Sequence, residues 1–185
     1  MAGQYGFLID MRRCNGCRTC SMACKSENAT PPGVLWRRVR QFTPDDPNDI
    51  AFISMSCNHC DEPQCLKACP AHTYVKRPDG IVAQEHHEFC VGCRMCVMAC
   101  PYNAPVFDRA EGKTGKCDLC AARIDEGLKP RCAEACPSGA LRFGEIAELR
   151  KGREDETSLI ARRCRLPDPS HSKPNIVILP AWPHS

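Results

Sequence analysis

The stretch Cys90-Val-Gly-Cys93-Arg-Met-Cys96-Val-Met-Ala-Cys100-Pro101 decides how this chain folds. Its spacing, C-x2-C-x2-C-x3-C-P, is that of the bacterial ferredoxin run for a 4Fe–4S cluster. In such a run the first three thiolates hold one cluster, and the fourth cysteine ligates a second cluster. One run therefore predicts a partner run, and the sequence contains three more cysteine runs.

The other three runs lie on both sides of this third run. The first is Cys14-x2-Cys17-x2-Cys20-x3-Cys24, the second is Cys57-x2-Cys60-x4-Cys65-x3-Cys69, and the fourth is Cys117-x2-Cys120-x11-Cys132-x3-Cys136. Proline follows the last cysteine of the second, third and fourth runs, whereas Lys25 follows the first. Gly16 matches Gly92, and glycine at this place lets backbone amides approach the cluster sulfurs closely.

Composition narrows the classes of protein. The chain has 185 residues, of which 17 are cysteine and only 11 are aromatic. A disulfide scaffold is disfavoured, because neighbouring cysteines within a run are too close to bridge to one another. Zinc ribbons need no third and fourth cysteine in one run, so structural zinc is the weaker interpretation. We expect clusters to replace part of the hydrophobic core and the cluster-free chain to fold poorly.

Charge and hydropathy disfavour two further classes. A net charge of +3 is too small to indicate nucleic-acid binding. No segment approaches the roughly 18 consecutive apolar residues of a membrane span. The stretch before Cys14 leaves no room for a signal peptide, and no apolar region follows Arg12-Arg13 as a twin-arginine signal requires. We therefore expect a soluble chain with no membrane span of its own.

Local patterns predict short strands and helices between the runs. We expect strands over residues 5–10, 34–42 and 50–55, a helix over 18–26, a hairpin over 74–83, and a short helix within 121–131 that ends near Gly127. The hairpin turns at Asp79-Gly80, a dipeptide typical of tight turns. Arg37, Arg38 and Arg40 are interpreted as a solvated strand edge, with a docking patch as the alternative.

Linker lengths predict how the runs pair. A hairpin joins the second and third runs, so residues 57–111 form an inner ferredoxin unit. Only 16 residues, with no equivalent of Asp79-Gly80, separate the third and fourth runs. By elimination the first and fourth runs pair into an outer unit, 1–56 plus 112–150, and 151–185 form a C-terminal tail or partner-docking arm. The predicted fold class is α+β: two ferredoxin-like units, one nested within the other, around four clusters.

The rule that the last cysteine of a run serves the partner cluster assigns ligands for four 4Fe–4S clusters. Set one is Cys14, Cys17, Cys20 and Cys136; set two is Cys24, Cys117, Cys120 and Cys132; set three is Cys69, Cys90, Cys93 and Cys96; set four is Cys57, Cys60, Cys65 and Cys100. Because no ligand position is substituted, no three-iron cluster is expected. Cys164 is left over and is interpreted as an incidental thiol.

Other polar residues near the runs receive weaker assignments. His59 lies inside the second run, but every cluster already has four thiolates, so we expect it behind the ligands or at the surface. His86 and His87 are expected at the surface. The cations within the runs are Lys67, Arg94 and Arg131. These cations either raise cluster potentials by offsetting negative charge or are simply solvated.

The sequence contains no recognisable catalytic site. It has no glycine-rich phosphate loop, and none of its 6 histidines has an obvious nucleophile beside it. The identifiable chemistry is one-electron transfer through clusters, whose potentials span roughly −700 to +450 mV. Four clusters in so small a chain form a relay that needs a donor at one end and an acceptor at the other. We therefore predict an electron-transfer subunit and not a free-standing enzyme.

The four-run pattern, the long insert in the fourth run and the three Cys-Pro steps resemble the iron–sulfur subunits of molybdopterin oxidoreductases, most closely those of the anaerobic dimethyl sulfoxide reductase type. The shared stretches are Gln4-Tyr5-Gly6-Phe7-Leu8-Ile9-Asp10, Ser56-Cys57-Asn58-His59-Cys60, Cys100-Pro101-Tyr102 with Ala104-Pro105, and Lys173-Pro174-Asn175-Ile176-Val177-Ile178. The resemblance covers nearly the whole chain. It departs from the family in a shorter segment between the first two runs and an early C-terminus.

The resemblance implies a heterotrimer for anaerobic respiration. A molybdopterin catalytic subunit reduces a terminal acceptor such as dimethyl sulfoxide, an integral membrane anchor oxidises a quinol, and this subunit relays electrons between them. The resemblance also implies that set one faces the molybdenum subunit and that set four faces the anchor. The chain would lie peripherally on the bacterial cytoplasmic membrane through its partners, on the periplasmic face if the catalytic partner carries a twin-arginine signal.

Other interpretations stay open. Iron–sulfur subunits of polysulfide, thiosulfate, tetrathionate or nitrite reductases share the clusters but often carry their own export signal. Formate dehydrogenase subunits usually add a C-terminal membrane helix. A stand-alone polyferredoxin would not need residues 173–180, which are interpreted either as an arm laid on a partner or as an ordinary edge strand of this fold.

Overall fold

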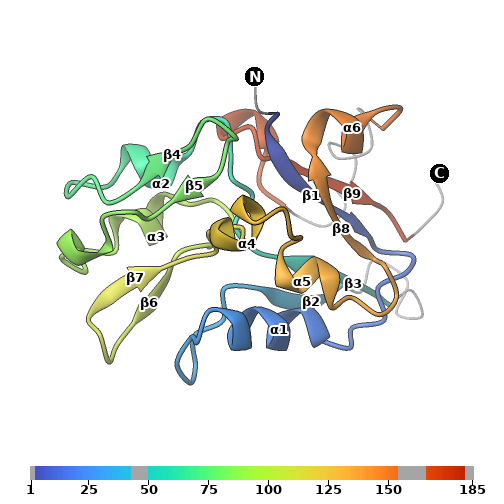
Figure 1. The fold of residues 1–185 in the computed structure, drawn as a ribbon, viewed down its shortest axis with the longest axis horizontal. Helices are drawn as coiled ribbons and strands as arrows, with labels where there is room; N and C mark the ends of the chain where they lie inside the picture. Colours follow the sequence, from blue (N-terminus) through green and yellow to red (C-terminus); the bar gives the residue numbers. More distant parts are fainter. Residues whose placement is uncertain (1–2, 43–49, 154–165, 182–185) are drawn as a thin grey trace.

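The computed structural model describes residues 3–42, 50–153 and 166–181. Its helices and strands are short, because the cysteine runs and their loops take up much of the chain. Figure 1 shows two halves along the long axis: the elements from residue 64 to residue 115 lie on the left, and those from the N-terminal and C-terminal segments lie on the right. The predicted α+β class is confirmed.

The right half is built on a three-stranded sheet in the order β8–β1–β9. The central strand is β1 (Tyr5–Asp10), to which β8 (Leu141–Glu145) pairs antiparallel and β9 (Ile176–Leu179) pairs parallel. The helix α6 (Ile146–Arg150) packs on one face of the sheet. Both faces are covered, which is why apolar residues run through β1 and β9 without alternation.

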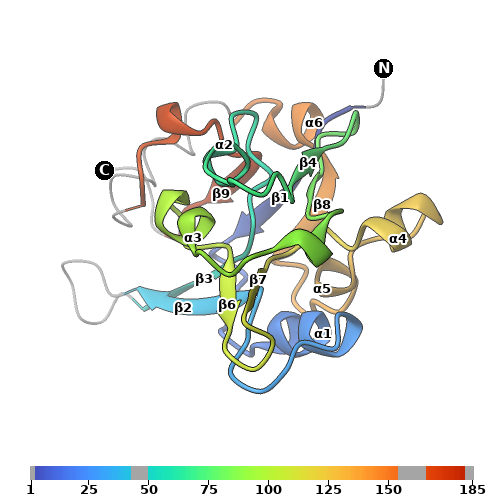
Figure 2. The same cartoon turned by 90° about the vertical axis from the view of Figure 1, so that its left-hand side faces the viewer.

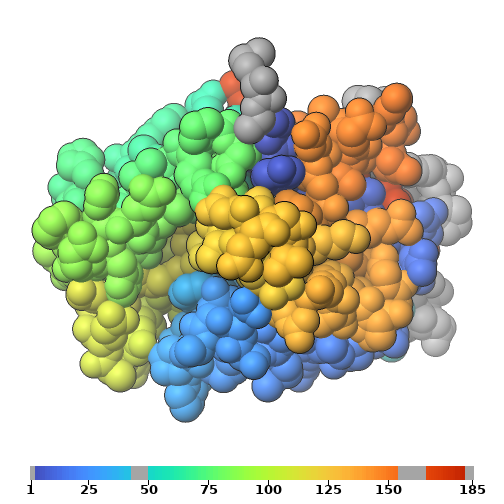
Figure 3. Space-filling view, viewed as in Figure 1, coloured from blue at the N-terminus to red at the C-terminus, as the bar shows by residue number. Residues whose placement is uncertain are grey.

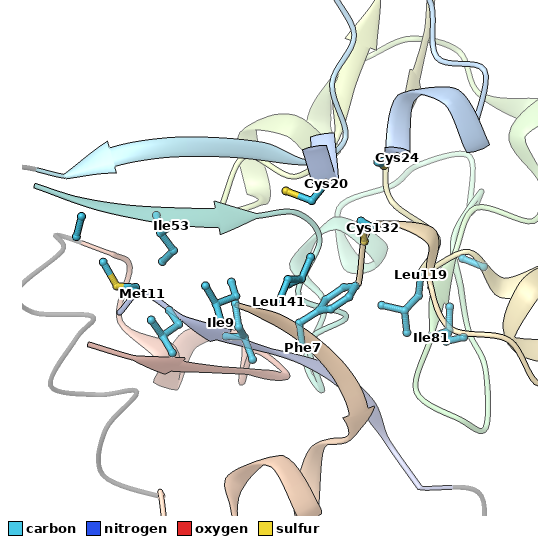
Figure 4. Close-up of a cluster of buried hydrophobic side chains, with 14 residues drawn as sticks. Phe7, Ile9, Met11, Cys20, Cys24, Ile53, Ile81, Leu119, Cys132 and Leu141 are labelled. Carbon is cyan, nitrogen blue, oxygen red and sulfur yellow. The ribbon is translucent and has the colours of Figure 1, made fainter. Parts of the chain in front are cut away.

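The main core lies on the other face of this sheet and mixes apolar side chains with cysteines. Phe7, Ile9 and Leu141 of the sheet lie beneath Cys24 and Cys132 in one buried cluster, as Figure 4 shows. Cysteine sulfurs thus occupy positions that aromatic and aliphatic side chains fill in most domains of this size. This mixed core explains how a chain with few aromatic residues encloses an interior.

Two strands and three helices surround this core. β2 (Arg38–Phe42) and β3 (Ala51–Met55) form a separate antiparallel pair. α1 (Thr19–Glu27) carries Cys20 and Cys24, and α5 (Arg131–Glu134) carries Cys132. The two helices contact each other, although their runs lie far apart in sequence. α4 (Ala121–Asp125) lies near the middle of the face seen in Figure 3, between the two halves.

The left half consists of two hairpins and two short helices. β4 (Val75–Lys76) pairs with β5 (Val82–Ala83), and β6 (Val106–Asp108) pairs with β7 (Lys113–Gly115). α2 (Gln64–Lys67) and α3 (Met95–Ala99) contact each other and face the viewer in Figure 2. Two 3-10 turns, η1 (His87–Phe89) and η2 (Pro169–His171), complete the described elements.

Most predicted elements are confirmed. They are the strand at 5–10, the helix now placed at 19–27, the strand now placed at 51–55, the hairpin that turns at Asp79-Gly80, and the helix at 121–125 before Gly127. The strand predicted over 34–42 is too long, since β2 begins at Arg38. The segment before β2 does not run along an edge, because the Arg37 side chain is buried in the interior.

A hairpin also joins the third and fourth runs, where the sequence predicted none. Between β6 and β7, Asp108 Oδ1 accepts a hydrogen bond from Ala110 N at 2.8 Å, and Gly112 has a φ of 73°. An Asp side chain and a left-handed glycine build a turn as well as Asp79-Gly80 does. Pairing of the first run with the fourth therefore cannot rest on a missing hairpin. Its support comes instead from the contact of α1 with α5.

The C-terminal segment folds onto the protein itself. All four residues of β9 are buried, and the strand forms an edge of the three-stranded sheet through its ladder with β1. Of the two interpretations of residues 173–180, the edge strand is thus confirmed. A free docking arm is wrong for Ile176–Leu179, because the backbone of this segment already pairs within the sheet.

Gly6 marks the tightest packing between β1 and its neighbours. A Cβ atom at Gly6 would lie 2.5 Å from Asn175 O and 2.7 Å from Ile146 Cδ1. We expect Gly6→Ala to lower the free energy of unfolding by about 1–3 kcal/mol, as overpacking of a well-packed interior does. Denaturant unfolding of the purified chain followed by circular dichroism measures the change.

Gly144→Ala is the matched control. Gly144 pairs with Gly6 across the β1–β8 ladder, but the nearest atom to its added Cβ is Leu149 Cδ2 at 3.8 Å, an ordinary contact. Equal destabilisation by the two variants would contradict this description of the sheet.

Candidate metal centres

Each run begins with the same local backbone. The residue before the second cysteine has a left-handed φ in every run: 75° at Gly16, 43° at His59, 65° at Gly92 and 64° at Leu119. Glycine adopts this conformation at no steric cost, and the sequence indicated it in two runs. In the other two, His59 and Leu119 are almost completely buried, so tertiary packing imposes a backbone conformation that such side chains rarely adopt.

The four cysteines of set one line one pocket, together with Ser54. Three come from the first run, and Cys136 arrives from the end of the fourth. Burial raises the pKa of the Cys14 thiol, and the sulfurs of Cys20, Cys136 and Cys17 raise it further. The structure therefore brings all four predicted residues together, with Cys17 exposed at the surface.

Set two lies where α1 meets the fourth run. Cys24 and Cys132 belong to one buried cluster and lie next to each other in Figure 4. Burial raises the pKa of Cys24 to about 12, with Cys132 and Cys120 adding to the rise. Cys117 is buried and interacts electrostatically with Cys24. The shares are the reverse of those in set one, because one cysteine of the first run joins three of the fourth.

The cysteines of set four line a second pocket, whose wall also includes Tyr102 and Lys116. Cys57, Cys60 and Cys65 come from the second run and Cys100 from the end of the third. Burial, followed by the nearby Cys57 sulfur, raises the pKa of both Cys60 and Cys65 to about 12. All four predicted members of this set lie together.

Set three combines the end of the second run with the third. Cys69 and Cys96 pack in one buried cluster. Thr114 Oγ1 lies 3.5 Å from Cys90 Sγ and 3.4 Å from Cys96 Sγ, so one hydroxyl faces both sulfurs. Cys93 is exposed on the loop before α3, three residues from each of these two.

The sets follow one another in the order one, two, four, three. Cys20 of set one shares a buried cluster with Cys24 and Cys132 of set two, Cys117 packs with Cys57 of set four, and Cys65 packs with Cys69 and Cys96 of set three. Set four therefore lies inside the row and set three ends it, which does not favour the expectation that set four faces a membrane anchor. Each end of the row carries an exposed cysteine, Cys17 in set one and Cys93 in set three.

The last cysteines of three runs accept backbone hydrogen bonds at sulfur. Thr73 N donates to Cys69 Sγ at 3.5 Å, Ala104 N to Cys100 Sγ at 3.4 Å, and Leu141 N to Cys136 Sγ at 3.5 Å. Proline follows each of these cysteines and ends the helical turn, which lets the chain fold back over the sulfur. After Cys24 the residue is Lys25 instead, and α1 continues to Glu27.

Two cations, Arg37 and Lys116, are buried among the sulfurs. The expectation that Arg37 lies on a solvated strand edge is wrong, because its guanidinium is enclosed and donates to Ser54 O at 3.2 Å and Ser56 Oγ at 2.7 Å. Lys116 was not identified from the sequence. Its position beside Cys117 was the available signal, but a lysine is almost always solvated, so burial could not be read from it.

The groups that can carry negative charge nearest these cations are cysteine sulfurs, with the Asp118 carboxylate as a weaker contributor at Lys116. Within the described residues, neither Arg37 nor Lys116 lies within 4.0 Å of a carboxylate oxygen. A buried cation without a counter-ion is strongly unfavourable. An iron–sulfur cluster held by four thiolates carries negative charge and supplies that counter-ion, whereas protonated thiols do not. The residues present therefore fit such clusters.

His59 lies behind the ligands, as one of its two interpretations predicted. Its Nδ1 accepts a hydrogen bond from Val82 N at 3.0 Å, which puts the proton on Nε2, 3.9 Å from Cys117 Sγ. Burial holds the pKa of His59 well below its ordinary value, so the ring is neutral. It supports a cysteine of the fourth run and not one of its own.

The other polar residues that the sequence analysis singled out lie at or near the surface, and Cys164 lies outside the described residues. Lys67, Arg94 and Arg131 are exposed. Lys67 pairs with Glu62, Arg131 pairs with Glu134, and Arg94 lies over the Phe107 ring. His86 is exposed and His87 half-buried.

Two kinds of structure, a site for a single metal ion and a membrane-spanning helix, are absent from residues 3–42, 50–153 and 166–181. No three His, Cys, Asp or Glu side chains form a site for a single metal ion. No helix is both long and apolar enough to cross a membrane.

Comparison with known proteins finds a matching family model and related sequences. A family model described as a 4Fe–4S dicluster domain matches residues 48–146. The sequence is 45% identical to the B chain of the anaerobic dimethyl sulfoxide reductase of Escherichia coli (strain K12), over 97% of this protein and 90% of that one. It is 40% identical to the protein of the same name in Haemophilus influenzae, over 96% and 89%. It is 38% identical to the B subunit of the tetrathionate reductase of Salmonella typhimurium, over 78% and 59%.

The variant His59→Ala tests the hydrogen bond from Val82 N that holds the His59 ring beside Cys117. The variant leaves the buried Val82 N–H without an acceptor, which we expect to lower the free energy of unfolding by about 1–3 kcal/mol. The measurement is the denaturant midpoint of the chain. His72→Ala is the control, since His72 also has a left-handed φ, 48° against 43°, but is exposed. A loss as large for His72→Ala would assign the effect to backbone conformation and not to the hydrogen bond.

Proposed function

The protein belongs to the family of 4Fe–4S dicluster proteins that includes the B chains of anaerobic dimethyl sulfoxide reductases, and on this premise we propose how it works. It is the electron-transfer subunit of a molybdoenzyme complex and has no catalytic site of its own. The observation that carries the proposal is the row of four cysteine sets with an exposed cysteine at each end. Such a row gives electrons one point of entry and one of exit.

Each set holds one 4Fe–4S cluster, with the ligands assigned from the sequence. The cluster, when bound, takes up and passes on one electron at a time. The chain's own residues hold the thiolates, donate backbone N–H groups to the sulfurs of Cys69, Cys100 and Cys136, and keep water from the interior sets by burial. Fixed donors of this kind favour the more negative, reduced cluster.

The clusters lie in two nested units. The outer unit, residues 1–56 plus 112–150, holds sets one and two, and the inner unit, residues 57–111, holds sets three and four. The contact of α1 with α5 supports the outer unit, and the contact of α2 with α3 supports the inner one. β9 belongs with the outer unit, because its partner is β1.

The two ends of the row differ in surface chemistry. Near Cys93 four large apolar side chains are exposed: Phe89, Val91, Met95 and Met98. Near Cys17 the exposed side chains are mostly polar and basic, among them Arg13 and Arg18, although Met22 of the same run is also exposed. We assign the apolar end to a quinol-oxidising integral membrane anchor, since exposed apolar patches mark binding sites. The other end faces a molybdopterin catalytic subunit, so electrons run from set three through sets four and two to set one.

The terminal acceptor is a property of the catalytic partner. Dimethyl sulfoxide is the first candidate, because the relatives covered almost end to end are named as dimethyl sulfoxide reductase chains. Tetrathionate is the second, supported by the relative of that name at 38% identity. In either complex the chain associates with the membrane peripherally, through the anchor.

Purification of the native complex tests the function. We expect this chain to bring down a molybdenum-containing subunit and an integral membrane subunit, and the complex to reduce dimethyl sulfoxide with quinol as donor. A second assay with tetrathionate separates the two acceptors. Isolation of the chain alone, with activity toward a soluble electron carrier, would contradict the proposal.

Cys93→Ser tests the assignment of the apolar end. Loss of one thiolate from set three is expected to convert that cluster to a three-iron species and to stop turnover with quinol, while a dye that reduces the catalytic subunit directly still supports it. Electron paramagnetic resonance and the two assays measure these outcomes.

Cys164→Ser, at the cysteine outside the four runs, is the control and should change neither spectrum nor activity. An unchanged spectrum in Cys93→Ser would refute the ligand assignment. A new spectrum with normal quinol turnover would refute the placement of set three at the entry point.

A further inference from the structure

We propose that Arg37 and Lys116 are fixed positive charges at two of the three junctions of the relay and raise the reduction potentials of the clusters they face. Arg37 acts where set one meets set two, and Lys116 where set two meets set four. The proposal rests on the proposed function, because it concerns clusters held by these sets. It adds two residues to the relay that ligate nothing.

Arg37 is enclosed between two sets. It is 1% exposed, and its guanidinium lies over the Phe7 ring, with Cζ 4.3 Å from the ring centroid. The sulfurs that interact with it electrostatically are Cys20 of set one and Cys132, Cys117 and Cys24 of set two. An arginine side chain keeps its proton in proteins, so the charge of Arg37 is permanent in this buried position.

Hydrogen bonds connect the Arg37 charge to set one. Arg37 Nη1 donates to Ser54 Oγ at 3.1 Å, and Ser54 Oγ lies 3.2 Å from Cys20 Sγ. Because the arginine can only donate, the serine hydroxyl accepts from it and is free to donate its own proton to the sulfur. Within the described residues Arg37 Nε has no hydrogen-bond partner. The other two nitrogens are fixed by hydrogen bonds to Ser54 and Ser56, which hold the charge in place between sets one and two.

Lys116 takes the corresponding place at the next junction. It is 3% exposed, and its Nζ donates to Val82 O and, at 3.0 Å, to Cys117 O. It lines the set four pocket, and its ammonium interacts with Cys57 and Cys65 of set four, with Cys117 of set two and, more weakly, with the Asp118 carboxylate. Val82 also donates its N–H to His59 Nδ1, and the other ring nitrogen of His59 lies 3.9 Å from Cys117 Sγ. Lys116 and His59 therefore each contact both Val82 and Cys117.

These two cations differ from the other described cations near the runs. Lys67, Arg94 and Arg131 are exposed, and salt and water screen their charges. Arg37 and Lys116 are screened much less, because they are buried. The charge of Arg37 or Lys116 therefore acts strongly on the two sets beside it and only weakly on the other sets.

The effect on electron transfer follows from charge. Reduction adds one negative charge to a cluster, and both burial and a second anionic cluster nearby make that addition less favourable. All four cysteines of set two are buried and none of set four is exposed, whereas sets one and three reach the surface at Cys17 and Cys93. Without the cations the inner clusters would have the lower potentials and would form a barrier in the middle of the relay. Each electron that leaves one cluster enters the next, so no other reactant is required.

Redox titration of the membrane-bound complex, followed by electron paramagnetic resonance, tests the proposal. Signals are assigned to sets with one cysteine-to-serine variant in each. Arg37→Gln should shift sets one and two to lower potential and leave set three unmoved. Lys116→Gln should shift sets two and four and leave set one unmoved.

Arg37→Lys and Lys116→Arg keep the charge, so in these variants the potentials should stay close to those of the unaltered complex. Arg40→Gln, which removes an exposed cation of β2, is the control without a shift.

Ser54→Ala is a second, milder variant for the case in which the glutamine variants fail to load clusters. It keeps the Arg37 charge and removes the hydroxyl between Arg37 and Cys20, so set one alone should shift to lower potential. Unmoved potentials in all variants, or loss of clusters in the glutamine variants together with an unmoved set one in Ser54→Ala, would overturn the proposal and leave both cations a structural role. Absence of cluster signals from the unaltered complex would instead refute the proposed function.

Discussion

Sharing of cysteines between distant runs holds this fold together. In every set the last cysteine of one run lies with the first three of another, as Cys24 does with Cys132 and Cys136 does with Cys14. Three helices that carry predicted ligand cysteines, α2, α3 and α5, have four or five residues and would not form alone in water. With the proposed clusters bound, metal ligation between runs does the work that helix and sheet packing does in larger cores.

Buried negative charge is the consequence of that arrangement. The four clusters proposed for this chain require positive charge and hydrogen-bond donors close by. The chain supplies backbone N–H groups at the last cysteines of three runs, and it supplies Arg37 and Lys116 at two of the three junctions between sets. The same groups that make the clusters compatible with the interior also act on their potentials, so stability and electron transfer have one physical origin here.

Much of the site could be predicted from the sequence, because cluster ligation fixes residue type and spacing together. The runs and most of the elements beside them were readable from local patterns, whereas the pairing of the first run with the fourth rested on the absence of a hairpin that the structure contains. The burial of Arg37 was not readable either, because three arginines within four residues look alike until the fold turns one inward. The left-handed Leu119 and the order of the sets were also hidden. Both depend on contacts between residues far apart in the chain, which no local pattern records.

The central claim is that four iron-containing clusters lie in one row, in the order of sets one, two, four and three. X-ray diffraction from crystals of the complex, with anomalous data collected at the iron edge, tests it most directly. The account predicts four iron peaks in this chain, each beside the cysteines of one set, with the peaks of sets one and three at the two ends. Fewer than four peaks, an anomalous signal from zinc in their place, or a peak bound within a single run would contradict it.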